Sequence, residues 1–594
     1  MRDSNRYKKK VFILLLTMIT CLFQNSLYAQ EKNIPYVSKQ WVPEVWSSAI
    51  PDSCPFKKSE KFSAIAFLGK HVSYTDADTW YPSWASDGNM YSGWADGEIG
   101  LESSHSSGGI KANTGTAKIV GEDPLNLQVT SLGIVQSSAL PYEGRYPCAN
   151  LVYNGIWYYG TYGIDFDPKP ENKKYSWAIC GPLPGFRISK DYGKTWIPCP
   201  LNLYNPLFPE SGKNGQHVKM GTPHFVDFGK NLEYSPDGKA YLVGHGAAED
   251  DPNPRVANNS WIAGDAIYMA RVQPSPETIN DMSSYEFFAG NDKDGVPIWS
   301  GNFSDIKPIM EWKHHMGCTN ITYDKPLNKY IMCVTDGWPG IANMSSYILE
   351  SEKITGPYRL ITYMKDFGTQ GYFLTIPSKF ISSDGKTVWL SYSANFSEKY
   401  FGDRTKANPK ESRYAWNLQQ IQLLNDKQKG NFLEQSLKGQ PDPIKSNKNL
   451  ALRARVLVST SLKSTRPMTE LSEYFGIGAV DGIVNLNPES KNKLNEWISD
   501  GEKTSAFLRL TWPKPQDVSK VLLFDLPDLN AQITSGLLVF SDGSTIKVSG
   551  LPNNAESAKE IKFPAKKITW LAFFVNSVSA TTENVGLAEI AVFK

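Results

Sequence analysis

The sequence contains no apolar run long enough to cross a membrane. Its longest run, Val11–Phe23, falls short of the roughly 18 residues that a membrane-spanning helix needs. It also lacks an excess of one charge, because 62 lysines and arginines face 60 aspartates and glutamates. This balance excludes the basic face that a nucleic acid requires. The six cysteines beyond Cys21 show no metal-ligand spacing; their even number permits disulfides but does not define the pairing.

The first 29 residues have the pattern of a secretory signal peptide. Positive residues, among them Arg2 and Arg6, precede the apolar run, and the small residue Ala29 follows it. We therefore expect the mature chain to begin near Gln30 and to be secreted, periplasmic or displayed on the cell surface. Cys21 leaves lipid anchoring open. Removal of residues 1–29 changes the formal net charge from +2 to −2, which is still close to neutral.

A strand-turn-strand pattern recurs five times. The five segments begin at Trp80, Arg145, Gly221, Gly317 and Leu374. Four centre on Asp-Gly or Asn-Gly turns and the fourth on Lys-Pro-Leu-Asn, and β-branched and aromatic residues flank all of them. Further strand patterns separate them, and no amphipathic helix of ordinary length does. We predict an all-β fold in which residues 30–426 form a five-bladed β-propeller. A series of β-sandwich domains is the rival.

The composition changes after residue 426. Residues 427–449 are charged and poor in strand patterns, and we interpret them as a linker. Residues 450–594 alternate in the manner of β-strands. Their "AVDG", "NEWIS", "FSDGS" and "GLAEIAVF" segments resemble a discoidin-like jelly roll. The resemblance implies a β-sandwich of the kind that holds sugars in bacterial secreted enzymes, although a stabilising appendage without a ligand stays open.

Acidic residues stand at both free ends of the first hairpin. With its turn at Ser86–Gly88, an antiparallel register pairs Asp78 with Asp96, Asp76 with Glu98, and Trp80 with Trp94. Like charges that face each other across two strands repel. Two carboxyl groups forced together split their pKa values, as an acid and base pair requires. We therefore predict Asp78 and Asp96 as the catalytic pair.

In a propeller, the free ends of all inner hairpins meet at one mouth. The expected mouth residues are Asp76, Asp78, Asp96, Glu143, Arg145, Asp165, His224, His245, His314, His315, Asp336, Gln370 and Asn395. The candidate sugar platforms are Trp80, Trp84, Trp94, Trp157 and Tyr162. We expect substrate contacts and proton transfer from this set. Structural roles also fit: Arg145 could neutralise Glu143, and the histidines could be hydrogen-bonded core residues. No cofactor is indicated, although calcium could occupy the funnel.

Two resemblances extend this interpretation. "SKDYGKTW" (Ser189–Trp196) resembles the Asp-box of sialidase-type propellers, which implies a folding role for Asp191. The hairpin segments across Phe67–Leu424 resemble arabinanase, xylosidase and fructosidase propellers, and more closely a less-studied group of secreted propeller glycosidases. This likeness implies that Asp78 is a catalytic aspartate.

The chain departs from those families where they place a general-acid glutamate on the third blade. Here that hairpin ends in His224 and His245, with Glu249 and Asp265 nearby but out of register. Asp96 is therefore our preferred proton donor.

The sequence thus predicts a secreted, monomeric glycoside hydrolase that acts on a complex polysaccharide or glycan. Two alternatives stay open. One is a polysaccharide lyase with His224 or His315 as base and Arg145 as the group that neutralises a substrate carboxylate. The other is a glycan-binding surface protein without catalysis.

Overall fold

The computed structural model describes most of the chain beyond Glu44. The described residues are 36–38, 44–165, 179–213, 216–250, 259–341, 343–396, 409, 412–430, 432, 444, 448–462, 476–484, 496–555 and 557–594. The predicted signal peptide and most of the predicted linker lie outside them. No helix within the described ranges is both long and apolar enough to span a bilayer.

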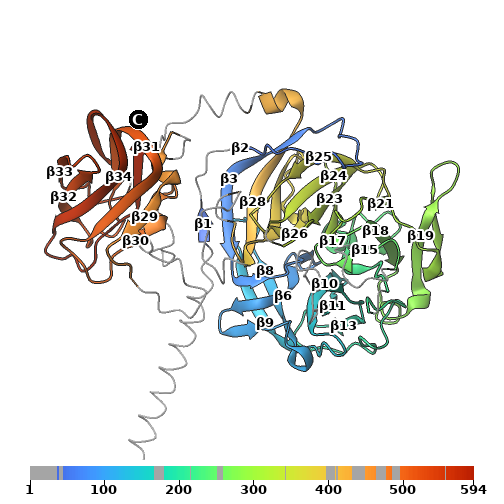
Figure 1. The fold of residues 1–594 in the computed structure, drawn as a ribbon. Helices are drawn as coiled ribbons and strands as arrows, with labels where there is room; N and C mark the ends of the chain where they lie inside the picture. Colours follow the sequence, from blue (N-terminus) through green and yellow to red (C-terminus); the bar gives the residue numbers. More distant parts are fainter. Residues whose placement is uncertain are drawn as a thin grey trace, which may run out of the picture. The chain divides into compact units, whose positions relative to one another are not determined.

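The described residues form mainly β-strands, joined by turns and short 3-10 helices, which confirms the all-β prediction (Figure 1). The chain divides into two compact units, made chiefly of Val45–Glu398 and Leu433–Lys594. Strand β28 (Trp416–Leu424) also belongs to the first unit. Each unit contains a buried apolar core of its own.

The five predicted hairpins are all present in the first unit. They are β4 (Asp76–Asp78) with β6 (Met90–Ile99), β10 (Gly144–Tyr153) with β11 (Ile156–Asp165), β14 (Gly221–Phe225) with β15 (Ala240–Gly246), β22 (Thr319–Asp324) with β23 (Lys329–Asp336), and β26 (Tyr372–Thr375) with β27 (Thr387–Ser393). Local turn chemistry accounts for them. Asn154 and Gly155, for example, have φ angles of 50° and 78°, the left-handed conformations that an Asn-Gly hairpin turn requires.

Each hairpin continues outward into a larger sheet. The added strands are β8 (Asn113–Val120) and β9 (Gln128–Gln136), β13 (Gly185–Ser189), β18 (Ala266–Val272) and β19 (Tyr285–Asn291), and β24 (Ser345–Ser351) and β25 (Arg359–Met364). The fifth sheet has the order β26-β27-β28-β3, with β3 spanning Ala64–Tyr74. The beginning and the end of the unit therefore share one sheet, and Figure 1 shows β3 beside β28.

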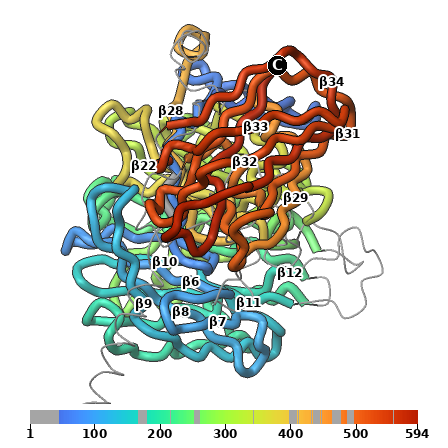
Figure 2. The backbone as a smooth tube through the Cα atoms, turned by 90° about the vertical axis from the view of Figure 1, so that its left-hand side faces the viewer, coloured from blue at the N-terminus to red at the C-terminus, as the bar shows by residue number. Residues whose placement is uncertain are grey.

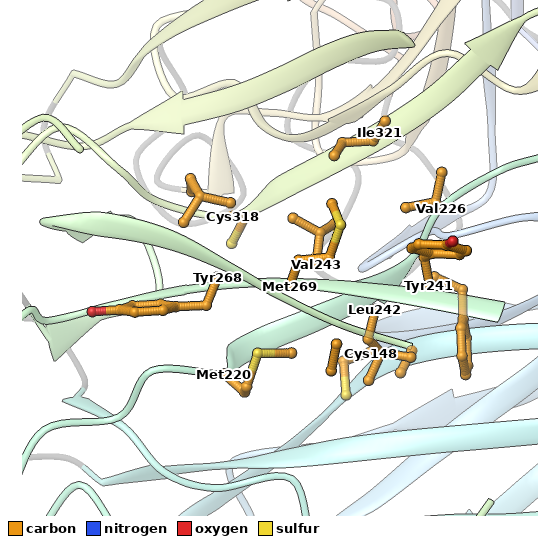
Figure 3. Close-up of a cluster of buried hydrophobic side chains, with 14 of the residues drawn as sticks. Cys148, Met220, Val226, Tyr241, Leu242, Val243, Tyr268, Met269, Cys318 and Ile321 are labelled. Atoms are coloured by element: carbon orange, nitrogen blue, oxygen red, sulfur yellow. The ribbon is translucent and has the colours of Figure 1, made fainter. Parts of the chain in front are cut away.

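Apolar side chains from different sheets fill the space between the sheets. In Figure 3, Cys148 of β10, Met269 of β18 and Ile321 of β22 belong to one such cluster. Its cysteines are not bridged, because all six cysteines of the described ranges are free thiols. The stability of this unit therefore comes from apolar burial and hydrogen bonding.

The turn after β13 is organised by one aspartate. Asp191 Oδ1 accepts hydrogen bonds from the Thr195 backbone N–H (2.9 Å) and the Ser189 hydroxyl (2.8 Å), and the Thr195 hydroxyl donates to Oδ2 (2.6 Å). These bonds, led by those from Thr195, lower the pKa of Asp191 to about 2. Gly193 has a φ of 90°, and a Cβ there would lie 2.8 Å from the Trp157 ring. The turn thus needs its aspartate and its glycine.

The second unit is a β-sheet structure with the strand order β29-β31-β34-β32-β33. These strands are β29 (Arg455–Val458), β31 (Phe507–Phe524), β34 (Lys559–Val578), β32 (Ile533–Phe540) and β33 (Thr545–Ser549), and β36 (Glu589–Phe593) also pairs with β31. Figure 2 shows β32 beside β33. The buried rings of Trp497 and Trp512 donate to the Thr460 and Leu450 carbonyls at 2.8 Å. Buried indoles with satisfied N–H groups anchor this core.

Candidate active site

The first hairpin departs from its predicted register at one position. Asp76 pairs with Glu98 as expected, but Asp78 pairs with Ala95, so the predicted Asp78–Asp96 pairing is wrong by one residue. An irregularity between Asp76 and Asp78 causes the shift. Asp96 itself has a left-handed φ of 43°. Close approach of the strands requires Gly97, where a Cβ would lie 2.0 Å from the Asp76 carbonyl oxygen.

Asp78 is held by two hydroxyl donors. The residue is only 8% exposed. The Thr79 hydroxyl donates to Oδ1 and the Tyr372 hydroxyl to Oδ2, both at 2.9 Å. Tyr372 begins the fifth hairpin, so this contact joins the first and fifth sheets. Such donors fix the orientation of a carboxyl group and favour its charged form.

Asp96 is half-buried and has a different set of donors. The Ser106 backbone N–H donates to Oδ1 at 2.7 Å, and the Tyr414 hydroxyl donates to the Asp96 carbonyl oxygen. Tyr146 also forms a side-chain hydrogen bond with Asp96, and its hydroxyl contacts that of Ser107. Asp96 therefore lies where the first sheet, the second hairpin and the segment before β28 come together.

The charges of both aspartates affect the pKa values of the same three tyrosines. Burial is the main cause that raises the pKa of Tyr146, Tyr372 and Tyr414, and the negative charges of Asp78 and Asp96 add to it in all three. Both aspartates thus act on the same phenol groups. The sequence analysis missed these tyrosines, although Tyr146 and Tyr372 stand at the free ends of recognised hairpins.

Asp76 lies at the edge of this cluster. The Arg413 Nη2 atom is 3.4 Å from Asp76 Oδ1, and both side chains are partly exposed. Arg413 comes from the segment before β28, next to Tyr414. Long ion pairs of this kind add little stability. The pair instead brings a positive charge close to the aspartates.

Four of the five predicted sugar platforms are wrong. Trp80, Trp94, Trp157 and Tyr162 are each at most 1% exposed, and Trp80 stacks on Trp416 with ring centroids 5.4 Å apart. The strands that carry Trp94, Trp157 and Tyr162 are buried on both faces, so alternation leaves none of these three rings exposed. The fifth, Trp84, is half-buried at the turn end of the first hairpin.

His224 and His245 are core residues, which corrects their prediction as mouth residues. Each is 1% exposed. The His224 ring stacks on Tyr81 at 3.6 Å, and burial lowers its pKa well below the usual range. His245 contacts the Thr222 hydroxyl at 3.0 Å through Nδ1 and the Ser260 carbonyl at 2.8 Å through Nε2, and burial lowers its pKa to about 4. Neither imidazole can reach a substrate.

Other predicted mouth residues make local contacts. Arg145 donates to the Thr161 hydroxyl at 2.7 Å and the Ser138 carbonyl at 3.1 Å. Asp165 lies 3.6 Å from Lys213. Gln370 donates to the Ile341 carbonyl at 2.7 Å, and Asn395 to that of Ser412. The arrangement gives Arg145 a bond within its own hairpin in place of the pairing with Glu143.

His315 and Asp336 meet directly. The His315 Nδ1 atom is 2.7 Å from Asp336 Oδ2, which also accepts from the Tyr363 hydroxyl at 2.8 Å. Asp336 is 0% exposed, whereas the His315 side chain is 15% exposed. A buried carboxylate thus orients an imidazole that keeps part of its surface open. Within the described ranges, no group of three or more His, Cys, Asp or Glu side chains is placed to hold a metal ion.

Several residues with strained backbone conformations lie at the free ends of the hairpins. The residues other than glycine with left-handed φ angles include Thr75, Thr79, Asp96, Thr222, His314, Thr369, Phe373 and Asn395. Such conformations are unusual for β-branched and aromatic residues, and they concentrate at functional sites. The turns at the opposite ends of the hairpins mostly use asparagine and glycine, which adopt them easily, with Leu232 of the third turn as an exception. The strain therefore marks the open ends.

Comparisons with known proteins match the C-terminal part of the chain to one family model and find similar solved structures. Residues 449–593 match a family model described as a domain of unknown function, DUF7402. No curated protein matches the chain. One similar solved structure is a glycoside hydrolase, 12% identical, with a TM-score of 0.31 over 87% of this chain and 97% of that one.

Two further structures are carbohydrate-binding modules of Clostridium perfringens. One, in complex with GalNAc-beta-1,3-galactose, is 16% identical with a TM-score of 0.19 and covers 24% of this chain and 97% of that one. The other, of family 32 and in complex with galactose, is 14% identical with a TM-score of 0.19 over 24% and 96%. At such scores these likenesses carry no argument about fold or function.

Proposed function

We propose that the protein is a secreted glycoside hydrolase in which Asp78 and Asp96 are the catalytic pair. The observation that carries this proposal is that Asp78 pairs with Ala95, the neighbour of Asp96, and that tyrosine hydroxyl groups bind both residues. Glycoside hydrolysis needs two carboxyl groups on either side of the scissile bond. One protonates the leaving oxygen, and the other activates water or attacks the anomeric carbon. Asp76, Arg145, Asp165 and His315 are the proposed substrate-binding residues that keep some exposed surface, whereas Asp336 is fully buried and instead orients His315.

The proposed architecture of the first unit is a five-bladed propeller. Its support is the ring of neighbouring strands: β6 contacts β10, β10 contacts β14, β14 contacts β22, β22 contacts β26, and β28 contacts β4. The sheet that contains both β3 and β28 would close this ring. All hairpin turns then lie on one side and all free ends on the other. This places the aspartates and the strained backbone at one mouth.

We assign the role of general acid to Asp96 and the role of general base or nucleophile to Asp78. Asp78 is nearly buried, and the two hydroxyl groups that donate to it orient its oxygens. Asp96 is half-buried, so a leaving group can approach it more easily. The second unit, by its sequence resemblance, is a discoidin-like module that would hold a sugar chain.

The test compares Asp78→Asn and Asp96→Asn with the wild type. The proteins are screened against plant, algal and host glycans with product chromatography. Each substitution removes a proton-transfer group or nucleophile, and we expect turnover to fall by about 10²- to 10⁴-fold. Asp87→Asn is the matched control, because Asp87 caps the turn at the other end of the same hairpin. Unchanged turnover in both site variants would refute the assignment, and an ultraviolet-absorbing unsaturated product would indicate a lyase.

A further inference from the structure

Two adjacent histidines form a second polar cluster outside the carboxylate pair. The His315 Nδ1 atom faces Asp336, which accepts three hydrogen bonds: from His315, from the Tyr363 hydroxyl and, at 3.1 Å, from the Trp338 backbone N–H. In the neutral imidazole, Nδ1 carries the proton because the carboxylate accepts, and Nε2 is then left as an acceptor. Within the described ranges, Nε2 has no partner of its own.

Contacts with Trp338 and Asp265 also fix the orientation of the His314 ring. Its ring stacks on Trp338 with centroids 4.2 Å apart and planes 10° apart. Its backbone N–H donates to Asp265 Oδ1 at 3.0 Å, and its Nδ1 atom lies 3.7 Å from the same oxygen. The backbone holds a left-handed φ of 70°. Its side chain is 18% exposed, so the cluster presents two oriented imidazoles to solvent.

A short path connects this cluster to Asp78. Tyr372, which binds Asp78, lies edge-on to Trp261 with ring centroids 5.3 Å apart. The carbonyl of the next residue, Ile262, accepts from the Gly337 N–H at 2.8 Å, and Gly337 lies between Asp336 and Trp338. The chain from Trp261 to Asp265 spans at most about 14 Å. The two clusters are therefore linked through the buried residues Trp261 and Ile262 of the first unit.

We propose that His314, His315 and Trp338 form a subsite for a neutral sugar unit of an extended substrate. This inference rests on the proposed glycosidase function. An acceptor nitrogen needs a hydroxyl donor, which every neutral sugar carries. The carboxylate of Asp336 behind His315 would repel a uronate, and the Trp338 ring, which stacks on His314, is half-buried and keeps part of its apolar surface exposed.

The test measures binding in the Asp78→Asn protein by titration calorimetry. The probes are oligosaccharides of two to six units from arabinan, xylan and fructan, with oligogalacturonates as the anionic arm. His315→Gln in that background should weaken the binding of the longer neutral chains by about tenfold, the value of one hydrogen bond, and leave the dimers unchanged. Trp338→Ala should do the same, whereas Trp338→Phe should retain most of the affinity.

His217→Gln is the control, because His217 also pairs with an aspartate, Asp250, but belongs to another loop. Equal losses for dimers and hexamers, tighter binding of oligogalacturonates, or no His315-dependent binding of any neutral chain would overturn the subsite. So would a collapse of turnover for short substrates in His315→Gln alone, which would make His315 a catalytic base. Failure of the glycosidase proposal appears separately, as full hydrolysis by Asp78→Asn.

Discussion

Single residues in this protein have protonation states that burial sets. Glu210 is buried and accepts backbone hydrogen bonds from Lys219 (2.8 Å) and Met220 (3.2 Å). Burial outweighs these bonds and raises its pKa from 4.5 to about 7. Between these values the folded protein binds a proton that the unfolded chain has released. Glu210 therefore lowers the free energy of unfolding as the pH rises from 4.5 to 7.

The variant Glu210→Gln tests this effect. Glutamine does not titrate, so its stability relative to the wild type should increase from pH 4.5 to pH 8 by up to about 3 kcal/mol. Urea unfolding of both proteins at several pH values measures the difference. Because each protein is compared at the same pH, the other titrating groups cancel. A difference that is constant with pH would contradict the raised pKa.

At the residue level, sequence patterns locate the acids at the ends of the first hairpin but do not predict which side chains are buried. Acids at the ends of the first hairpin were recognisable because like charges facing each other are unfavourable. The burial of Trp94 and His224 was not, because β6 and β14 are buried on both faces, and alternation alone does not predict that neighbouring sheets cover both. Tyr146, Tyr372 and Tyr414 look like ordinary strand residues in the sequence, and only the fold brings them to the aspartates.

At the scale of elements, the first hairpin depends on close contact between β4 and β6. A Cβ at Gly97 would lie 2.0 Å from the Asp76 carbonyl oxygen and 2.6 Å from the Ala77 Cα. We expect Gly97→Ala to push the strands apart, lower the free energy of unfolding by about 1–3 kcal/mol and reduce activity by moving Asp78. Thermal unfolding and turnover measure both effects.

Gly301→Ala is the control, because no atom lies within 4 Å of a Cβ built there. Wild-type turnover in Gly97→Ala would show that the strand spacing does not position Asp78.

The same hairpin shows why registers are harder to predict than turns. The Asp87-Gly88 turn follows from local residue preferences, whereas the irregularity in β4 depends on contacts with other sheets, so the pairing of Asp78 shifted by one residue.

At the scale of the whole molecule, the first unit is held together by pairing between its two ends. Asn417 of β28 is 0% exposed and joins three strands. Its Oδ1 atom accepts from the Ser73 hydroxyl of β3 at 2.8 Å, and its Nδ2 atom donates to the Tyr392 carbonyl of β27 at 3.2 Å and the Arg413 carbonyl at 2.7 Å. This buried amide can hold the two ends of the unit together because both of its polar atoms are hydrogen-bonded.

Asn417→Ala should therefore destabilise the first unit selectively. The substitution leaves several buried polar groups without partners, at about 1–3 kcal/mol for each such group. Because each unit has its own core, we expect two transitions in calorimetry and a lower midpoint only for the first unit. Gln420→Ala, a half-buried amide on the same strand, should change little. If both midpoints fell together, or neither moved, the pairing of β3 with β28 would not be what holds the ends of the first unit together.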